Sequence, residues 1–333
     1  MENIQDIVDH IVATVERHRI SPGNYCRWLW QNEKGDRELG SNPYGCADAA
    51  NLLYTVGHFP ADPEERQHWI QTLQNFQQPE TGLFYETTHH TFHTTAHCLG
   101  ALELFDAKPL YPLTAMHRYL PEGKIEEFLE NLDWRNDPWD QSHQGAGVYA
   151  ALVLAEEADL SWCNRYFGWL WDNADPNTGM WRKGEPEQAS PRGILAHMAG
   201  TFHYLFNHEY AHMPLRYPDK LIDKCIEMYD VRHVSTAFGK KLGFSEVDWV
   251  YCLSRASRQT PYRREDVKDR LSKFCKEYLQ YWRSLDWEKD DEPNDLHSLF
   301  GASCALAELQ SALPGELLTE KPLKLVLDRR PFI

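Results

Sequence analysis

The sequence predicts one all-α domain, residues 1–333, in which six inner helices are surrounded by about six outer helices. Two observations predict this fold. Segments rich in small apolar residues alternate along the chain with more charged segments, and almost nothing alternates polar and apolar residues with the period of two that half-buried strands require. The composition, 42% hydrophobic and 25% charged, is that of a folded globular protein.

The inner helices are predicted from segments that begin with polar or turn residues and continue with Gly, Ala, Ser and Cys. These small residues let helix backbones approach closely, as buried helices around a common centre must. The six segments are residues 42–57, 93–105, 142–158, 191–210, 245–257 and 295–309.

The outer helices are predicted from segments with more charge and longer side chains, such as KIEEFLENL and KFCKEYLQYW. Two of them belong to an internal repeat, because residues 69–86 and 166–184 align at a constant offset. Each repeat is an amphipathic helix followed by a Pro-x-Thr-Gly turn. Gly82 and Gly179 are predicted to supply the positive φ that such a turn demands.

These repeats, in which the turn is followed by a hydrophobic and an aromatic residue, resemble those of the α/α-toroid superfamily. That group includes terpenoid cyclases, protein prenyltransferase β-subunits, many glycoside hydrolases and the helical polysaccharide lyases. The resemblance extends over most of the chain. It implies an (α/α)6 toroid whose substrate cavity lies near the N-termini of the inner helices.

Charge and cysteine content limit the possible partners. The formal net charge of −16 argues against nucleic acid and against anionic membrane surfaces. No apolar run approaches the roughly 20 residues that span a bilayer, and the acidic, amphipathic N-terminal segment is unlike a signal peptide. Eight scattered cysteines without a CxxC pair indicate reduced thiols. We therefore expect a cytoplasmic protein.

Polar and aromatic residues gather at the predicted starts of the inner helices. The candidate catalytic residues are Asp48, His93, Asp140, His143, Glu246, Asp248 and His297. The candidate substrate-binding residues are Tyr44, Trp139, Gln144, Arg192, His197, Trp249 and Asp295. Aromatic rings beside carboxylates and imidazoles are typical of a sugar site, where rings stack on the sugar and polar groups hold its hydroxyls.

The acidic candidates have two interpretations. Asp48 with Asp140, or Glu246 with Asp295, could form the pair of carboxyl groups that glycoside hydrolysis uses. Alternatively, the three aspartates are N-caps or first-turn acids, which helices favour in any case.

Histidines raise the question of a metal. His93 and His97 are four residues apart and would share a helix face, so they could bind a metal, act as a base or cap a helix start. The prenyltransferase resemblance implies a zinc site at Asp248, Cys252 and His297, but the Asp and Cys are four apart here and two apart in that family. With no HExxH motif either, we expect no cofactor, and Cys252 is expected to fill space in the core.

The predicted function is that of a carbohydrate-active enzyme, a glycoside hydrolase or lyase acting on an oligosaccharide by acid/base catalysis. In a lyase, Arg192 would neutralise the uronate. One alternative is an isoprenoid or prenyl-diphosphate enzyme on the same scaffold, either with or without a bound divalent metal. The other is a binding toroid without catalysis. The terminal segment LDRRPFI is expected either to dock across the barrel or to fray.

Overall fold

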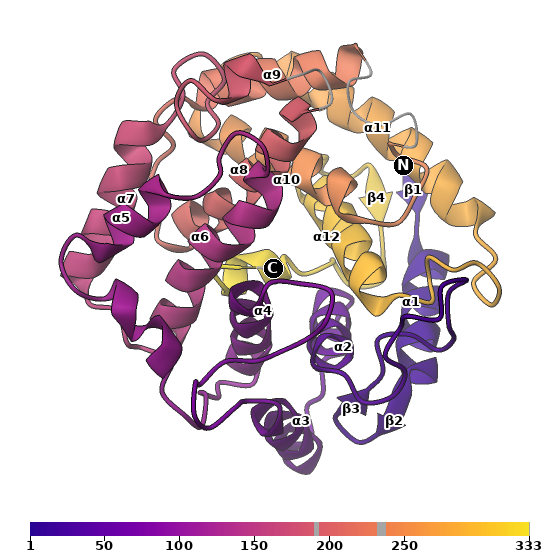
Figure 1. The fold of residues 1–333 in the computed structure, drawn as a ribbon. Coiled ribbons are helices and arrows are strands. Elements are labelled where there is room, and N and C mark those ends of the chain that lie inside the picture. Colours follow the sequence, from indigo (N-terminus) through magenta and orange to yellow (C-terminus); the bar gives the residue numbers. More distant parts are fainter. Residues whose placement is uncertain (190–192, 232–237, 333) are drawn as a thin grey trace.

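The computed structural model describes residues 1–189, 193–231 and 238–332. Its described part is built almost entirely from α-helices, as predicted (Figure 1). Six helices, here called the central helices, correspond to the six small-residue segments. They are α2 (Pro43–Thr55), α4 (Thr91–Leu104), α6 (Pro138–Leu154), α8 (Gly193–Tyr210), α10 (Phe244–Gln259) and α12 (Leu296–Ala312).

The central helices contact one another in chain order, and α12 also contacts α2 (Figure 1). Their small residues explain the close approach. An added Cβ on Gly147 of α6 would lie 3.0 Å from the Phe92 carbonyl oxygen of α4, and one on Gly200 of α8 would lie 2.9 Å from the Pro138 carbonyl oxygen. Larger side chains at these positions would push the helices apart.

The other six α-helices of the described residues lie at the periphery of the view in Figure 1. They are α1 (Gln5–Arg17), α3 (Pro63–Asn75), α5 (Lys124–Glu130), α7 (Leu160–Asn173), α9 (Pro218–Asp230) and α11 (Arg264–Ser284). Each buries one apolar stripe and exposes its charged face, which is the pattern that the sequence predicts for an outer layer.

The two repeated turns have the same backbone hydrogen bonds. In the first, the Gly82 N–H donates to the Gln78 carbonyl at 2.8 Å; in the second, the Gly179 N–H donates to the Asp175 carbonyl at 2.9 Å. The two glycines have φ angles of +73° and +71°. The predicted positive φ is therefore confirmed at both turns.

Short elements connect the helices. Strand β1 (Glu2–Asn3) pairs in parallel with β4 (Leu317–Leu318), and β2 (Arg19–Ser21) pairs with β3 (Asn24–Tyr25). The 3-10 helices are η1 (Thr114–Tyr119), η2 (Pro186–Gln188) and η3 (Val326–Arg329). Among the described helices, none is long and apolar enough to cross a bilayer.

The C-terminal segment docks among the central helices, which settles the choice between docking and fraying. Helix η3 contacts α2, α4 and α8, and Figure 1 shows this end of the chain near the centre of the molecule. Arg330 and Phe332 are fully buried. The Asn207 side chain of α8 donates to the Pro331 carbonyl at 2.6 Å, which fixes the segment in place.

Candidate functional site

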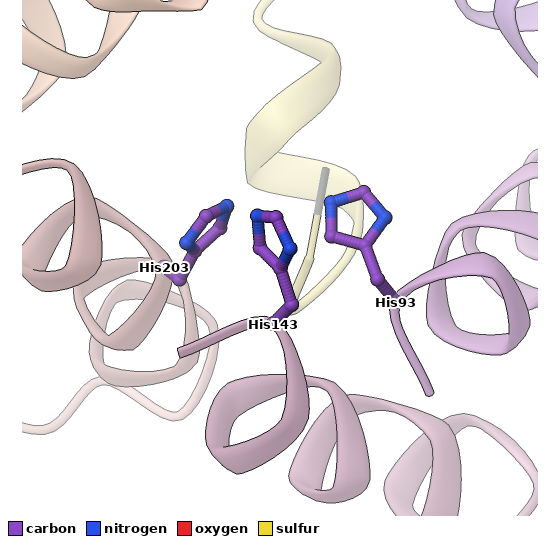
Figure 2. A group of neighbouring side chains, drawn as sticks. All are labelled: His93, His143 and His203. Carbon is purple, nitrogen blue, oxygen red and sulfur yellow. The ribbon is translucent and has the colours of Figure 1, made fainter. Parts of the chain in front are cut away.

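Three histidines from neighbouring central helices meet in the interior (Figure 2). His93 of α4, His143 of α6 and His203 of α8 each place one ring nitrogen within 4.8 Å of the other two. The ring centroids of His93 and His143 are 4.4 Å apart, and those of His143 and His203 are 4.8 Å apart. We call these residues the histidine triad. All three side chains are buried.

A serine determines which nitrogen of His203 carries the proton. Ser142 Oγ lies 2.5 Å from the Trp139 carbonyl and 2.8 Å from His203 Nδ1. The carbonyl can only accept, so the single hydroxyl proton goes to Trp139 and Ser142 Oγ accepts from His203 Nδ1–H. His203 Nε2 is therefore left with a free lone pair.

The other two triad members also have a polar group near Nδ1. Tyr44 Oη is hydrogen-bonded to His93 Nδ1, and Asp140 Oδ1 lies 3.7 Å from His143 Nδ1. Burial, followed by the other histidines nearby, lowers the pKa of His93 and His143 well below the usual value. Burial lowers the pKa of His203 to about 3. All three imidazoles are thus neutral at physiological pH.

A second buried cluster centres on Asp48 of α2. Its Oδ1 accepts hydrogen bonds from His97 Nε2 at 2.9 Å and from His297 Nδ1 at 3.1 Å. Although burial opposes ionisation, the two imidazoles together hold the Asp48 pKa below its usual value. Since the carboxylate only accepts, the proton of His297 lies on Nδ1, and its Nε2 is the basic nitrogen.

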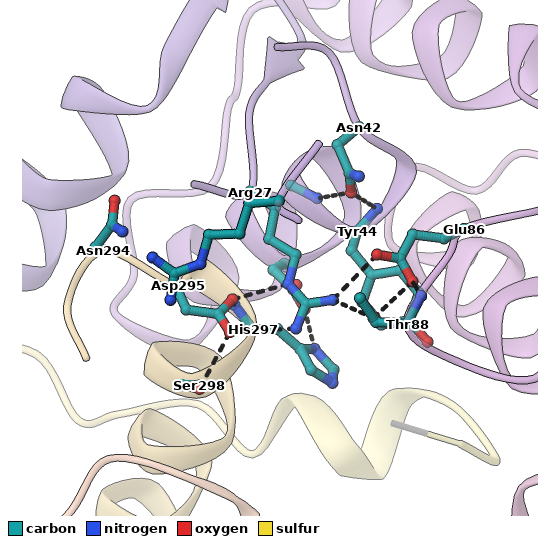
Figure 3. A network of polar contacts seen from close by, with 12 residues as sticks. Arg27, Asn42, Tyr44, Glu86, Thr88, Asn294, Asp295, His297 and Ser298 are labelled. Carbon is teal, nitrogen blue, oxygen red and sulfur yellow. Dashed lines mark hydrogen bonds and ion pairs between the residues drawn. The ribbon is translucent and has the colours of Figure 1, made fainter. Parts of the chain in front are cut away.

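A polar network joins the segments that precede α2, α4 and α12 (Figure 3). The buried Arg27 donates to Asp295 Oδ1 at 2.8 Å and to Thr88 Oγ1 at 2.7 Å, and it pairs with Glu86 at 3.3 Å. Asp295 also caps α12 by accepting the His297 N–H at 3.0 Å. This aspartate therefore orients the start of α12, and its oxygens are engaged by protein groups.

A pocket of about 390 Å³ lies at the first turns of α6, α8, α10 and α12. Its walls include Trp139, Lys241, Phe244, Asp248 and Ser298. The pocket adjoins both clusters, because the Trp139 ring lies 5.7 Å from that of His143 and the Phe244 ring lies 4.4 Å from that of His297.

Two wall residues have uncommon environments. Trp139 keeps 44% of its surface exposed. Asp248 is only 3% exposed, and burial, with Glu246 as a lesser contributor, raises its pKa well above the usual value. Asp248 is therefore a carboxylic acid that keeps its proton in conditions where an exposed aspartate is ionised.

Comparison with family models, curated proteins and solved structures finds no match. A conclusion about function therefore rests on the geometry of the site alone.

The structure places about half of the predicted site residues in or beside the histidine triad, the Asp48 cluster or the pocket. Tyr44, His93 and His143 contact one another directly or through the triad, and His297 belongs to the Asp48 cluster. Trp139 and Asp248 share the pocket. His93 and His97, predicted to share a helix face, both point inward, but to different clusters.

Other predicted residues lie elsewhere. Trp249 is fully buried on the far side of α10, where it stacks on Tyr229 and donates to the Cys225 carbonyl, so it is a core residue and not a sugar platform. Glu246 is buried and accepts the Gly239 N–H at 3.0 Å. Arg192 lies outside the described residues.

Three more predicted residues lie on the central helices. His197 is buried near the Trp181 carbonyl. Asp140 lies in the first turn of α6 with 67% of its side chain exposed, and Gln144 is half-buried on the same helix.

Sequence reasoning missed His203, Ser142, Arg27 and Glu86. The candidate residues were expected at the starts of the inner helices, whereas His203 lies in the third turn of α8. A signal was present, because His197, His203 and His208 interrupt a helix that is otherwise almost entirely apolar. Arg27 precedes the first central helix in an irregular segment, and no periodicity indicates where such a residue lies.

Proposed function

We propose that the protein is a carbohydrate-active enzyme of the (α/α)6 toroid architecture. The order of contacts among the central helices and the peripheral position of the other six support that architecture. The observation that carries the function is the pocket lined by both the partly exposed Trp139 and the buried Asp248, whose pKa burial raises well above the usual value. An exposed indole stacks on a sugar ring, and an un-ionised carboxyl group can donate a proton to a leaving oxygen.

The proposed chemistry uses Asp248 as the general acid and His297 as the general base. Asp248 gives its proton to the glycosidic oxygen while that bond breaks. His297 Nε2 removes a proton from the water that attacks the anomeric carbon. Asp48 holds the His297 tautomer and stabilises the imidazolium that forms, as a buried carboxylate does beside a catalytic histidine. The Asp48–His297 bond of 3.1 Å supports this role.

Incubation of the purified chain with a panel of neutral and uronic oligosaccharides tests this proposal. Product masses that sum to the substrate plus one water would indicate hydrolysis, and ultraviolet absorbance of an unsaturated uronate would indicate elimination. Absence of both across the panel would reject the proposal. Binding to Trp139 without turnover would favour the binding toroid.

Two matched variants locate the acid. Asp248→Asn keeps the size and neutral charge of the protonated side chain but cannot give up the proton, so kcat should fall about 10²–10⁴-fold. Asp172→Asn changes an exposed carboxylate on the peripheral helix α7 and should leave kcat within about threefold. Equal loss in both variants, or in neither, would contradict the assigned role of Asp248.

The apolar part of the wall supports isoprenoid chemistry as a second candidate. Leu195, Ala196, Ala199 and Leu242 face the pocket beside Lys241, so a hydrocarbon chain and an anionic group could both be held. Release of diphosphate from a prenyl diphosphate, with no activity on the sugar panel, would favour this function.

A further inference from the structure

We propose that the histidine triad, His93, His143 and His203, binds one divalent transition-metal ion of the kind that prefers imidazole ligands, such as Zn²⁺. The three donors come from three successive central helices and place their nitrogens within 4.8 Å of one another. This inference rests on the triad alone and does not depend on the proposed sugar chemistry.

The three rings point toward one another from three helices and pack edge to face, with interplanar angles of 68° between His93 and His143 and 78° between His143 and His203 (Figure 2). Among the described residues, no hydrogen bond joins the three imidazoles, and no carboxylate is interposed between them. A shared cation turns the same arrangement into three favourable bonds.

The residues behind the triad have the arrangement that metal-binding histidines need. Ser142 accepts from His203 Nδ1–H, so Nε2 is free to coordinate. Tyr44 Oη is hydrogen-bonded to His93 Nδ1, which occupies that nitrogen and leaves Nε2 as the one that can coordinate a metal. Such outer partners set the tautomer and orientation of a metal ligand and strengthen its binding.

The Asp48 cluster is the competing metal site, and its hydrogen bonds argue against it. Asp48 Oδ1 already accepts from His97 Nε2 at 2.9 Å and from His297 Nδ1 at 3.1 Å. A metal there would have to replace both protons, whereas in the triad the facing nitrogen of His203 carries none.

The ligand set also indicates the class of ion. Three imidazoles suit Zn²⁺, Cu²⁺, Ni²⁺ or Co²⁺, whereas Mg²⁺ and Ca²⁺ prefer oxygen ligands. Three protein donors leave a fourth coordination position for water or substrate, as in catalytic zinc sites. Phe332 packs against His93 and His203, at ring distances of 4.9 and 5.4 Å, and covers one side of the triad.

The test is metal binding by the full chain after it has been stripped with a chelator. We expect one equivalent of Zn²⁺ or Co²⁺ per chain, and Co²⁺ should show the intense visible bands of a four- or five-coordinate site. His143→Gln and His203→Gln should each weaken binding at least about 100-fold. His208→Gln is the matched control, since His208 is buried on the same helix but bonds the Tyr204 carbonyl, and it should bind normally.

A gentler variant covers the case in which a triad substitution prevents folding. Ser142→Ala keeps all three ligands and removes only the hydrogen bond to His203, so affinity should fall about 10–100-fold with an unchanged circular dichroism spectrum. The proposal is overturned if the wild-type chain binds no stoichiometric metal, or if folded Ser142→Ala binds as tightly as wild type. Loss of binding in His97→Gln with retention in His203→Gln would also overturn it, because the ion would then lie at Asp48.

Discussion

Glu246 shows at the scale of one residue how burial alone sets a charge state. Its side chain is inaccessible to solvent, one oxygen accepts the Gly239 N–H, and the other has no hydrogen-bond partner among the described residues. Burial raises its pKa to about 7. The folded state therefore holds a proton that the unfolded chain loses above its ordinary pKa of about 4.3, so stability from this group falls as pH rises through that window.

Replacing Glu246 should remove this loss of stability at high pH. We expect Glu246→Gln to stabilise the protein by about 1–3 kcal/mol at pH 8. At this pH the wild-type protein must either bury a charged carboxylate or bind a proton that an exposed glutamate would lose, and both cost free energy. At pH 5 the gain should be small, since the carboxyl group is already neutral. Urea unfolding at both pH values measures the difference. An equal effect at the two pH values would show that ionisation is not involved.

Individual residues were only partly predictable, and the reasons are physical. Asp295 and Asp140 lie at helix starts, where capping alone accounts for an acidic residue. Asp48 lies well inside α2, so capping does not explain it, and only the approach of His97 and His297 reveals its role. The sequence contains each of these residues but not the distances between helices that are far apart along the chain.

At the scale of elements, the repeated turns depend on glycine for two reasons. Gly179 has a φ of +71°, and a Cβ there would lie 2.6 Å from the Leu221 nitrogen and from the Tyr217 carbonyl. We expect Gly179→Ala to destabilise the protein by about 2–4 kcal/mol, through backbone strain and the clash with the start of α9. Gly168→Ala is the control, because Gly168 lies within α7 with open space beside it.

The control should show the opposite sign. Alanine has the higher helix propensity, so Gly168→Ala should be neutral or stabilise by up to about 1 kcal/mol. Thermal or denaturant unfolding of the two variants measures both effects. Similar changes in the two proteins would mean that the turn geometry does not constrain position 179.

A buried ion network ties several elements together. Arg255 of α10 pairs with Glu308 of α12, with Glu209 of α8 and with Asp328 of η3, and both Arg255 and Glu308 are 1% exposed. Arg255→Met should cost about 3–5 kcal/mol, because it leaves Glu308 charged and buried. Arg270→Met, which breaks a pair with Asp230 at the surface, should cost at most about 1 kcal/mol. Equal losses in the two variants would contradict this account.

Helices were the most predictable level of the structure. Segments rich in small residues form the central helices because small side chains allow helix backbones to pack closely. Charged segments form the peripheral helices because their charged face must stay exposed to water. Their ends were less predictable. The predicted start at residue 142 falls a full turn inside α6, which begins at Pro138, since proline is well tolerated at a first helical position.

For the whole molecule, buried histidines predict sensitivity to acid. His208 is buried, and burial lowers its pKa to about 4; burial also lowers the pKa of His18 and His197. Below pH 6.5 the unfolded chain binds protons that the folded chain excludes, so each such histidine lowers the unfolding free energy by up to about 1.4 kcal/mol per pH unit. Glu246 and Asp248, whose pKa values are raised, make the folded state more stable as the pH falls, but they are fewer than the buried histidines.

Stability should therefore fall as the pH is lowered from 7 to 5. Urea unfolding of the chelator-treated chain across this range measures how the unfolding free energy depends on pH. His208→Gln should reduce this slope by the equivalent of up to one bound proton, about 1.4 kcal/mol per pH unit. A stability that is constant or rises toward pH 5 would show that the buried histidines are not held neutral by the fold.

The contact between α12 and α2 has a consequence for how the chain folds. All other contacts between successive central helices join segments that are near neighbours in sequence, so they can form one after another with little loss of chain entropy, as in repeat proteins. The α12–α2 contact and the contacts of η3 with α2 and α4 join segments separated by most of the chain. The formation of these long-range contacts is therefore expected to be the slow, late step of folding. Substitutions of residues between α12 and α2 should mainly accelerate unfolding.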